Sequence, residues 1–254
     1  MFIKFPLTQG ILHVKHIKIN AEAPTIIFLH DALGCVATWK NFPERLAEMT
    51  KCNYLVYDRL GHGEASIDSR KRGVDYLELE ADILIQLIES LALKNVILFG
   101  HSDGGSIALI AASKYKKDLL GLVTEAAHVF VERITLQGVS IAKEFYAHGD
   151  LKEKLTKYHD SKTEALFEAW ANTWLSEEFR NWNIEYLLSE VNCPALIIQG
   201  EQDEYGTIKQ LEQIKKAVNA PVAVELLSNT GHTPHKEQTE LVLSITSQFI
   251  KNLV

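Results

Sequence analysis

Six short apolar runs recur along the chain, separated by polar and glycine-containing segments. The runs cover residues 25–30, 54–58, 96–100, 120–123, 195–199 and 222–227. Continuous apolarity of this kind is typical of strands that are buried on both faces. Because segments with helical periodicity lie between the runs, the pattern predicts an α/β fold with a mostly parallel, doubly wound sheet that is covered on both sides.

The helical periodicity is clearest just before the run at 96–100. One stripe there consists of Leu77, Ala81, Leu84, Ile88 and Leu91. We expect Asp75 to cap this helix and Glu78 to complete a capping box. A last helix should start after Thr233 and Pro234, and its apolar stripe consists of Val242, Ile245, Phe249 and Leu253. The first twenty residues alternate weakly, which indicates antiparallel edge strands.

Between residues 125 and 190 no strand-like run appears, and the segment is helical, polar and aromatic by turns. We therefore expect a helical cap, or lid, over 128–188, inserted into a core of 1–127 and 189–254. In open parallel sheets, ligands bind beyond the carboxyl ends of the strands, where such an insertion can cover a site. Trp170 and Trp174 are expected to line the pocket, although two tryptophans four residues apart on a helix would equally anchor the insertion.

Composition limits the possible partners and the compartment. The chain has 254 residues, is 46% hydrophobic and carries a net charge of −7, which argues against nucleic acid or an anionic membrane surface as a partner. No stretch approaches the length of a spanning helix. Cys35, Cys52 and Cys193 are odd in number and widely spaced, as expected for reduced thiols in a cytoplasmic protein. We expect a monomer or a homodimer.

The residues with the clearest chemistry follow the run at 96–100. Gly100-His-Ser-Asp-Gly104 is a Gly-x-Ser-x-Gly turn between a predicted strand and an Ala-rich helix, which is typical of a nucleophile elbow with Ser102 at its apex. Glycines leave room for the sharp bend. Mere packing of strand, turn and helix is the alternative reading of this pentapeptide.

An acid and a histidine follow in the order that a serine nucleophile needs. Asp203 comes shortly after the run at 195–199, and His232 comes after the run at 222–227. The chain order Ser102, Asp203, His232 is that of the alpha/beta-hydrolase triad and differs from the orders of the two main serine protease folds. His235 is the nearest rival, and we expect it to open the final helix and face elsewhere.

Three further segments extend the resemblance over nearly the whole chain. Leu29-His-Asp-Ala-Leu-Gly resembles the oxyanion loop of alpha/beta-hydrolases, the run from Tyr57 to Ser66 resembles their Asp-x-x-Gly-x-Gly-x-Ser segment, and Gly231-His-Thr-Pro-His-Lys-Glu resembles their Gly-His-x-x-His-x-Glu ending. The resemblance implies oxyanion donors at the backbone N–H groups of Asp103 and Ala32. Asp31 replaces the usual glycine, which leaves the second donor open.

The expected function is cleavage of a small carboxylic ester by a serine hydrolase through an acyl-enzyme, without cofactor or metal. Haloalkane dehalogenases and epoxide hydrolases, which resemble the chain in fold, carry Asp at the position of Ser102. Asp31 and Asp103 would attract an ammonium-bearing substrate. The Ser-Asp-Gly-Gly sequence also resembles that of biphenyl-hydrolase-like esterases, which act on amino-acid esters. Glu125 and His128 are expected to line the pocket.

Two alternatives remain open at this point. The first is hydrolysis of a carbon–carbon bond in a dienolate or diketo acid, for which Arg133 and Arg180 would supply the cation that binds the anionic substrate. The second is a non-catalytic ligand-binding protein on the same fold. An intact set of Ser102, Asp203 and His232 argues against the second.

Overall fold

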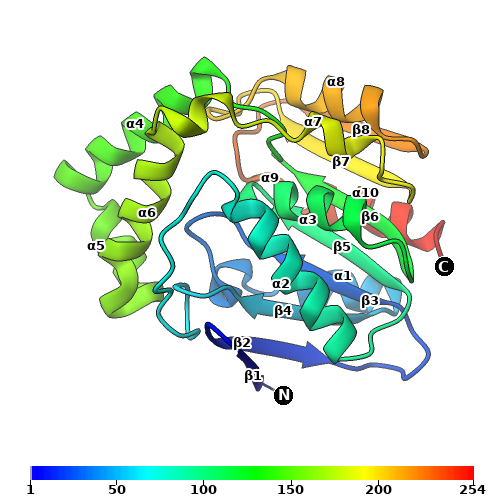
Figure 1. Cartoon of the computed structure of the whole chain (residues 1–254). Coiled ribbons are helices and arrows are strands. Elements are labelled where there is room, and N and C mark those ends of the chain that lie inside the picture. Colours follow the sequence, from blue (N-terminus) through cyan, green and yellow to red (C-terminus); the bar gives the residue numbers. More distant parts are fainter. Residues whose placement is uncertain (1) are drawn as a thin grey trace.

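The computed structural model describes residues 2–254, which form an eight-stranded sheet with the order β1-β2-β4-β3-β5-β6-β7-β8 (Figure 1). The strands are β1 (Phe2–Leu7), β2 (Gly10–Ile17), β3 (Thr25–Leu29), β4 (Asn53–Asp58), β5 (Val96–His101), β6 (Leu119–Glu125), β7 (Ala195–Gly200) and β8 (Val222–Leu227). β2 is antiparallel to β1 and β4, and all other neighbours are parallel. The predicted mostly parallel sheet and, from residue 2 on, the antiparallel edge are confirmed. Met1 of the predicted core lies outside the described residues.

The central strands are buried on both faces because their apolar side chains alternate between two cores. In β3, Ile27 and Leu29 pack with the helices of one face, whereas Ile26 and Phe28 pack with those of the other. This alternation follows from the two-residue period of a strand. It explains why these strands are continuously apolar in sequence.

Helices cover both faces of the sheet. They are α1 (Phe42–Thr50), α2 (Tyr76–Ser90), α3 (Asp103–Lys114), α4 (Arg133–His148), α5 (Leu151–His159), α6 (Thr163–Leu175), α7 (Glu185–Leu188), α8 (Ile208–Ala217), α9 (Pro234–Glu237) and α10 (Thr239–Lys251), with short 3₁₀ turns η1 (Val36–Trp39), η2 (Asp160–Lys162) and η3 (Glu178–Asn181). Buried residues of α2, α3, α7 and α8 share one core, and those of α1 and α10 share the other. The doubly wound arrangement is therefore present.

Two details of the helix predictions are wrong. Asp75 does precede α2, but its side chain makes no capping hydrogen bond, so the expected capping box is absent from this helix start. The stretch after Pro234 divides into α9 and α10, because Gln238 between them has a non-helical backbone. The buried side of α10 is formed by Val242, Leu243, Thr246, Ser247 and Ile250. Ile245, Phe249 and Leu253 are only partly buried at its margin.

The segment 128–188 contains α4, α5, α6 and α7. Figure 1 shows α4, α5 and α6 grouped together beyond one end of the sheet. An isolated bridge between Phe130 and Asn183 joins the two ends of the segment. α7 packs against α3 and α8. Within residues 2–254, no helix has the length and apolarity that crossing a membrane requires.

Candidate active site

Ser102 lies at a sharp turn between β5 and α3. Its backbone has φ 55° and ψ −120°, a conformation that costs energy for a residue with a side chain. A Cβ on Gly100 would overlap the carbonyl oxygen of Gly104, and a Cβ on Gly104 would overlap that of Leu29. The two glycines are therefore required by the close approach of the backbone, as the pentapeptide predicted.

A series of hydrogen bonds joins Ser102 to His232 and Asp203. The Oγ of Ser102 lies 2.9 Å from Nε2 of His232, and Nδ1 of His232 lies 2.8 Å from Oδ1 of Asp203. The carboxylate can only accept, so Nδ1 carries the proton and Nε2 accepts the hydroxyl hydrogen of Ser102. The structure thus brings together the three residues that the sequence placed after three different strands.

Asp203 is held by further donors from its own loop. Its Oδ1 accepts hydrogen bonds from the backbone N–H groups of Tyr205 (2.9 Å) and Gly206 (3.3 Å), and its Oδ2 accepts one from the Gln199 side chain (3.3 Å). Multiple donors favour the ionised carboxylate. The acid is therefore oriented by the protein before any ligand binds.

The buried pair shifts the pKa of both partners. Burial alone would lower the pKa of His232, but the charge and hydrogen bond of Asp203 outweigh it and raise that pKa above its ordinary value. Burial alone would raise the pKa of Asp203, but the charge and hydrogen bond of His232 hold it below its usual range. Both shifts favour the ion pair that forms when His232 takes up a proton.

The loop that carries His232 is fixed on both sides. The carboxylate of Glu237 accepts hydrogen bonds from the backbone N–H groups of Gly231 (2.7 Å) and Thr233 (2.9 Å). Nε2 of His101 donates to the carbonyl oxygen of His232 itself (2.7 Å). These contacts give a physical role to the glutamate of the Gly-His-x-x-His-x-Glu segment and to the residue before Ser102.

A cavity of about 80 Å³ lies over Ser102 and His232. Its lining includes the predicted pocket and oxyanion residues Asp31, Ala32, Asp103, His128, Trp170 and Trp174. Four further residues that line the cavity were not predicted from the sequence, namely Leu33, Thr135, Val139 and Tyr205. Leu33 and Tyr205 are close in sequence to Ala32 and Asp203, a signal that was available. Nothing in the local sequence marks Thr135 and Val139, which reach the cavity because α4 lies beside it.

Glu125 does not line this cavity, so that prediction is wrong. Strand periodicity places its side chain on the same face as Val123, toward α9, where it is fully buried. Its Oε2 lies 2.6 Å from Nδ1 of His235. His235 lies in α9 rather than at the start of the last helix, α10, but its ring faces Glu125 and not Ser102, as expected. The pair lies beneath the elbow, because the backbone carbonyl of Glu125 accepts the N–H of Ser102 (2.8 Å).

The two carboxylates beside Ser102 differ in their surroundings. Asp103 is buried, its Oδ2 accepts the Tyr76 hydroxyl (2.9 Å), and Nη1 of Arg59 lies 3.9 Å from the same oxygen. Asp31 is partly exposed, and Nδ1 of His101 lies 3.7 Å from its Oδ1. Among residues 2–254, those that line the cavity include these two carboxylates and no lysine or arginine. The cavity wall is therefore negatively charged.

The cysteines offer no second nucleophile here. Cys35, Cys52 and Cys193 are free and buried, and burial, with the charge of Asp58, raises the pKa of Cys35 to about 11. A protonated thiol is a poor nucleophile. No group of three or more His, Cys, Asp or Glu side chains within residues 2–254 is arranged to hold a metal ion.

Comparison with known proteins agrees with this geometry. Residues 26–245 match the sequence model of the alpha/beta hydrolase family. The chain is similar to the serine hydrolase BPHL of Mus musculus, at 26% identity over 76% of this chain and 67% of that protein. It is also similar to putative esterase/lipase 1 of Mycoplasma genitalium, at 23% identity over 98% and 99% of the two chains.

A solved structure shows the same fold. A crystal structure from a study of carboxylesterases of Nitrososphaera gargenis superposes with a TM-score of 0.81 at 16% identity, covering 100% of this chain and 98% of that one. The chain spans about two thirds of the BPHL relatives, 67% of the mouse protein and 62% of the human one. At this identity the solved structure shows the fold alone, and the substrate has to be inferred from the site itself.

Proposed function

Since this chain belongs to the alpha/beta hydrolase family, we propose that it is a serine hydrolase that cleaves a small carboxylic ester through an acyl-enzyme intermediate. The observation that carries the proposal is the unbroken series of hydrogen bonds from Ser102 through His232 to Asp203. A hydroxyl within reach of a neutral imidazole, which a carboxylate orients in turn, is the arrangement that activates a serine nucleophile.

In this mechanism, Oγ of Ser102 attacks the acyl carbon while Nε2 of His232 takes the hydroxyl proton. The C–O bond to the leaving alcohol then breaks, and the imidazolium returns the proton to that oxygen. Water repeats the sequence on the acyl-enzyme, so that the carboxylic acid leaves and Ser102 regains its hydrogen. Asp203 stays ionised throughout and stabilises the imidazolium, in keeping with its lowered pKa.

Peptide geometry supports Asp103 and Ala32 as the oxyanion donors. The carbonyl of Ser102 accepts from the N–H groups of Gly105 and Ser106, so the N–H of the same peptide, on Asp103, points away from α3. The carbonyl of Asp31 accepts from Nη2 of Arg59 (2.7 Å). The N–H of Ala32 in that planar peptide therefore points to the opposite side.

The hydrogen bond from Arg59 to the Asp31 carbonyl oxygen also helps to explain how the loop tolerates Asp31 in place of glycine. The position has no positive φ, so it needs no glycine, and Nδ1 of His30 donates a second hydrogen bond to its carbonyl oxygen (2.8 Å). Two donors from buried side chains fix the loop without help from a glycine. We therefore propose the backbone N–H of Ala32 as the second oxyanion donor.

Within this class, the charge of the cavity favours an ester with an ammonium group. Asp31 and Asp103 line the cavity, and its small volume suits a short acyl group. Arg59 lies behind Asp103 and offsets part of its charge. The carbon–carbon bond alternative needs a cation at the substrate instead. Arg133 is exposed at the start of α4, and Arg180 faces a separate hollow, so neither supports it.

We also propose that 128–188 acts as a cap over a core of 1–127 and 189–254. The support is that α4 and α6 contribute four residues to the cavity wall, namely Thr135, Val139, Trp170 and Trp174. Trp174 is bonded through its Nε1 to the Tyr76 hydroxyl (2.9 Å), which ties α6 to α2. Trp174 thus both anchors the segment and faces the cavity.

A substrate panel tests the proposed class. We expect turnover of short amino-acid esters above that of neutral esters of equal size, and no turnover of vinylogous diketo acids. Asp103→Asn retains the backbone donor and should lower the preference for amino-acid esters by about ten- to a hundredfold in relative kcat/KM, as for a lost charged hydrogen bond. Equal losses for both ester types would restrict Asp103 to a structural role at the elbow. Preferred cleavage of diketo acids would contradict the ester proposal.

A further inference from the structure

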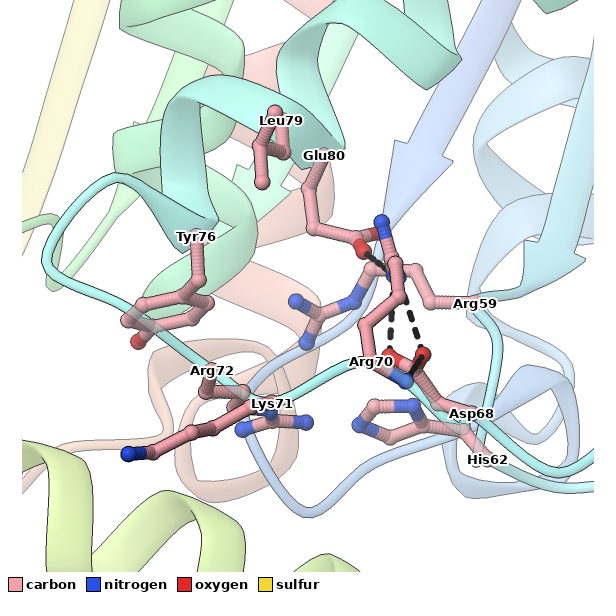
Figure 2. A pocket seen from close by; sticks show the side chains of 9 residues that line it. All are labelled: Arg59, His62, Asp68, Arg70, Lys71, Arg72, Tyr76, Leu79 and Glu80. Carbon is pink, nitrogen blue, oxygen red and sulfur yellow. Dashed lines mark hydrogen bonds and ion pairs between the residues drawn. The ribbon is translucent and has the colours of Figure 1, made fainter. Parts of the chain in front are cut away.

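A second cavity lies at the N-terminal end of α2, and Tyr76 lies between it and the Ser102 cavity. The ring of Tyr76 lines the second cavity, whereas its hydroxyl bonds to Asp103 and Trp174, which line the first. The second cavity has a volume of about 20 Å³, room for about one water-sized group. Figure 2 shows the side chains around it, with four cations among them.

Positive charge exceeds negative charge around this cavity. Arg59, Arg70, Lys71 and Arg72 line it, together with only two carboxylates, Asp68 and Glu80. Arg70 engages both carboxylates, with two bonds to Asp68 (2.8 and 2.9 Å) and one to Glu80 (2.6 Å). Oε2 of Glu80 is buried without a hydrogen-bond partner, but within residues 2–254 neither Arg59, Lys71 nor Arg72 forms a hydrogen bond or ion pair with Asp68 or Glu80. This concentration of positive charge lies in a protein whose net charge is −7.

Two arginines of the cavity have buried nitrogen atoms without a partner. Within residues 2–254, Nε of Arg59 and Nη1 of Arg72 are inaccessible to solvent and donate no hydrogen bond. Arg59 is only 2% exposed, and the guanidinium of Arg72 packs over the Tyr76 ring at 5.3 Å from its centre. Figure 2 shows both guanidinium groups beside Tyr76.

Such an arrangement is costly without an anion. Each buried donor without a partner forfeits its hydration, and two guanidinium charges at one small cavity repel each other. The same positive charges act on His62. Burial holds the pKa of His62 well below its usual range, and the charges of Arg59 and Arg72 lower it further. An anion in the cavity would supply the missing acceptors and reduce the repulsion.

A groove continues from this cavity toward α6. It has a volume of about 110 Å³ and shares Asp68, Arg70 and Arg72 with the cavity. Its other side chains are largely apolar, from Ile67, Ala165, Leu166 and Ala169. Lys162 lies at the same groove, with its Nζ bonded to the carbonyl oxygens of Gly63 and Ala65. A ligand that filled both spaces would have an anionic head and a short apolar tail.

We propose that the carboxylate of a small monocarboxylate binds where this arginine cavity meets the groove, with one oxygen in the cavity and its apolar tail in the groove between the 61–72 loop and α6. A planar carboxylate suits the arginines that line the cavity, since guanidinium groups bind carboxylates through directed N–H bonds, and a small side-chain shift would bring the unpaired donors of Arg59 and Arg72 to it. Lys71, exposed at the rim, adds attraction at longer range. The site is distinct from the Ser102 cavity, which carries the opposite charge.

Calorimetric titration of the whole protein with butyrate tests the site. Acetate probes the head alone, n-butylamine tests the sign of the charge, and phosphate and chloride test for general anion binding. We expect butyrate to bind more tightly than acetate and n-butylamine not to bind. Arg72→Gln should weaken butyrate binding by about ten- to a hundredfold, the usual effect of losing a charged hydrogen bond. Arg180→Gln, which removes an exposed arginine elsewhere, should have no effect.

Several outcomes would overturn the proposal. These are equal butyrate affinity in Arg72→Gln and wild type, binding of phosphate or chloride without butyrate, and no binding of any probe. If Arg72→Gln fails to fold, Lys71→Gln replaces it, because Lys71 is exposed and its loss should weaken binding measurably. The titration needs no turnover, so its result is independent of the proposed hydrolase activity.

Discussion

At the scale of single residues, His232 is held by partners from several separate parts of the chain. Its ring lies between Ser102 and Asp203, and Glu237 and His101 hold the backbone around it. Orientation of this kind is what a general base requires, because a misplaced imidazole cannot take the proton as the bond forms. The raised pKa of His232 is a measurable consequence of the Asp203 contact.

The pH dependence of kcat/KM should follow His232. Activity needs the neutral imidazole, so kcat/KM should rise with pH through an apparent pKa above the usual histidine value near 6.5. Asp203→Asn removes the charge that raises this pKa while burial remains, so the apparent pKa should fall. The amide also favours the wrong tautomer, and the rate should drop by about four orders of magnitude. Steady-state kinetics from pH 5 to 9 measure both effects.

Glu201→Gln is the matched control for this change. It neutralises an exposed carboxylate on the same loop, two residues from Asp203, and Glu201 is not one of the hydrogen-bond partners of the His232 ring, which are Asp203 and Ser102. Its profile should match that of wild type. A profile that shifts equally in both variants would assign the effect to the general field of the loop.

At the scale of secondary structure elements, the sequence was most informative where the local pattern alone determines the structure. The apolar strands and the turn around Ser102 could be predicted because two-faced burial and a sharp bend each restrict residue type directly. Glu125 was misplaced because the predicted apolar run stops at residue 123, whereas β6 extends to Glu125 and the two-residue strand period turns this side chain toward α9 and away from the cavity. Thr135 and Val139 depend on where α4 lies against the 201–207 loop, which no local pattern encodes.

At Gly138, α4 packs closely against that loop. A Cβ at this position would lie 2.7 Å from the carbonyl oxygen of Glu204 and 2.8 Å from the Tyr205 ring. Gly138→Ala should gain about 1 kcal/mol of helix propensity and lose about 1–3 kcal/mol to overpacking, a net loss of about 1 kcal/mol. Because α4 must shift away from the loop that carries Asp203, kcat/KM should also fall.

Chemical denaturation and ester kinetics check this expectation. Gln137→Ala, at an exposed neighbouring position on α4, is the control and should be neutral or slightly stabilising. A Gly138→Ala protein as stable and as active as Gln137→Ala would show that α4 and the loop do not pack closely in solution.

At the scale of the whole molecule, buried histidines couple folding to pH. Within residues 2–254, burial lowers the pKa of six histidines, which are the half-buried His16 and the buried His30, His62, His128, His159 and His235. The unfolded chain takes up protons at these residues near pH 6.5, whereas the native state does so only at lower pH. Their contribution to stability is therefore complete above pH 6.5 and is lost as the pH falls toward the native pKa values.

The melting temperature should consequently decrease from pH 7 to pH 5. His232 acts in the opposite direction, since its raised pKa contributes stability below pH 6.5 that is lost as the pH rises through the native value. One histidine with a raised pKa does not offset six with a lowered pKa. Each buried neutral histidine adds a slope of up to about 1.4 kcal/mol per pH unit.

Removing one buried histidine should reduce that slope. His159→Gln removes a group whose Nε2 donates to the carbonyl oxygen of Leu33, and the variant should lose less stability between pH 7 and pH 5 even if its stability at pH 7 is lower. His148→Gln, at an exposed position, is the control. The same slope in all three proteins would contradict the role of buried neutral histidines.

The most direct test of the central proposal is covalent labelling with a fluorophosphonate, read by mass spectrometry of the digested protein. We predict one adduct, on the peptide that contains Ser102, which is absent in Ser102→Ala and forms several orders of magnitude more slowly in His232→Ala. His235→Ala should label at close to the wild-type rate, since its ring faces Glu125. An unlabelled wild-type protein, or equal labelling of Ser102→Ala, would contradict the assignment of Ser102 as a nucleophile.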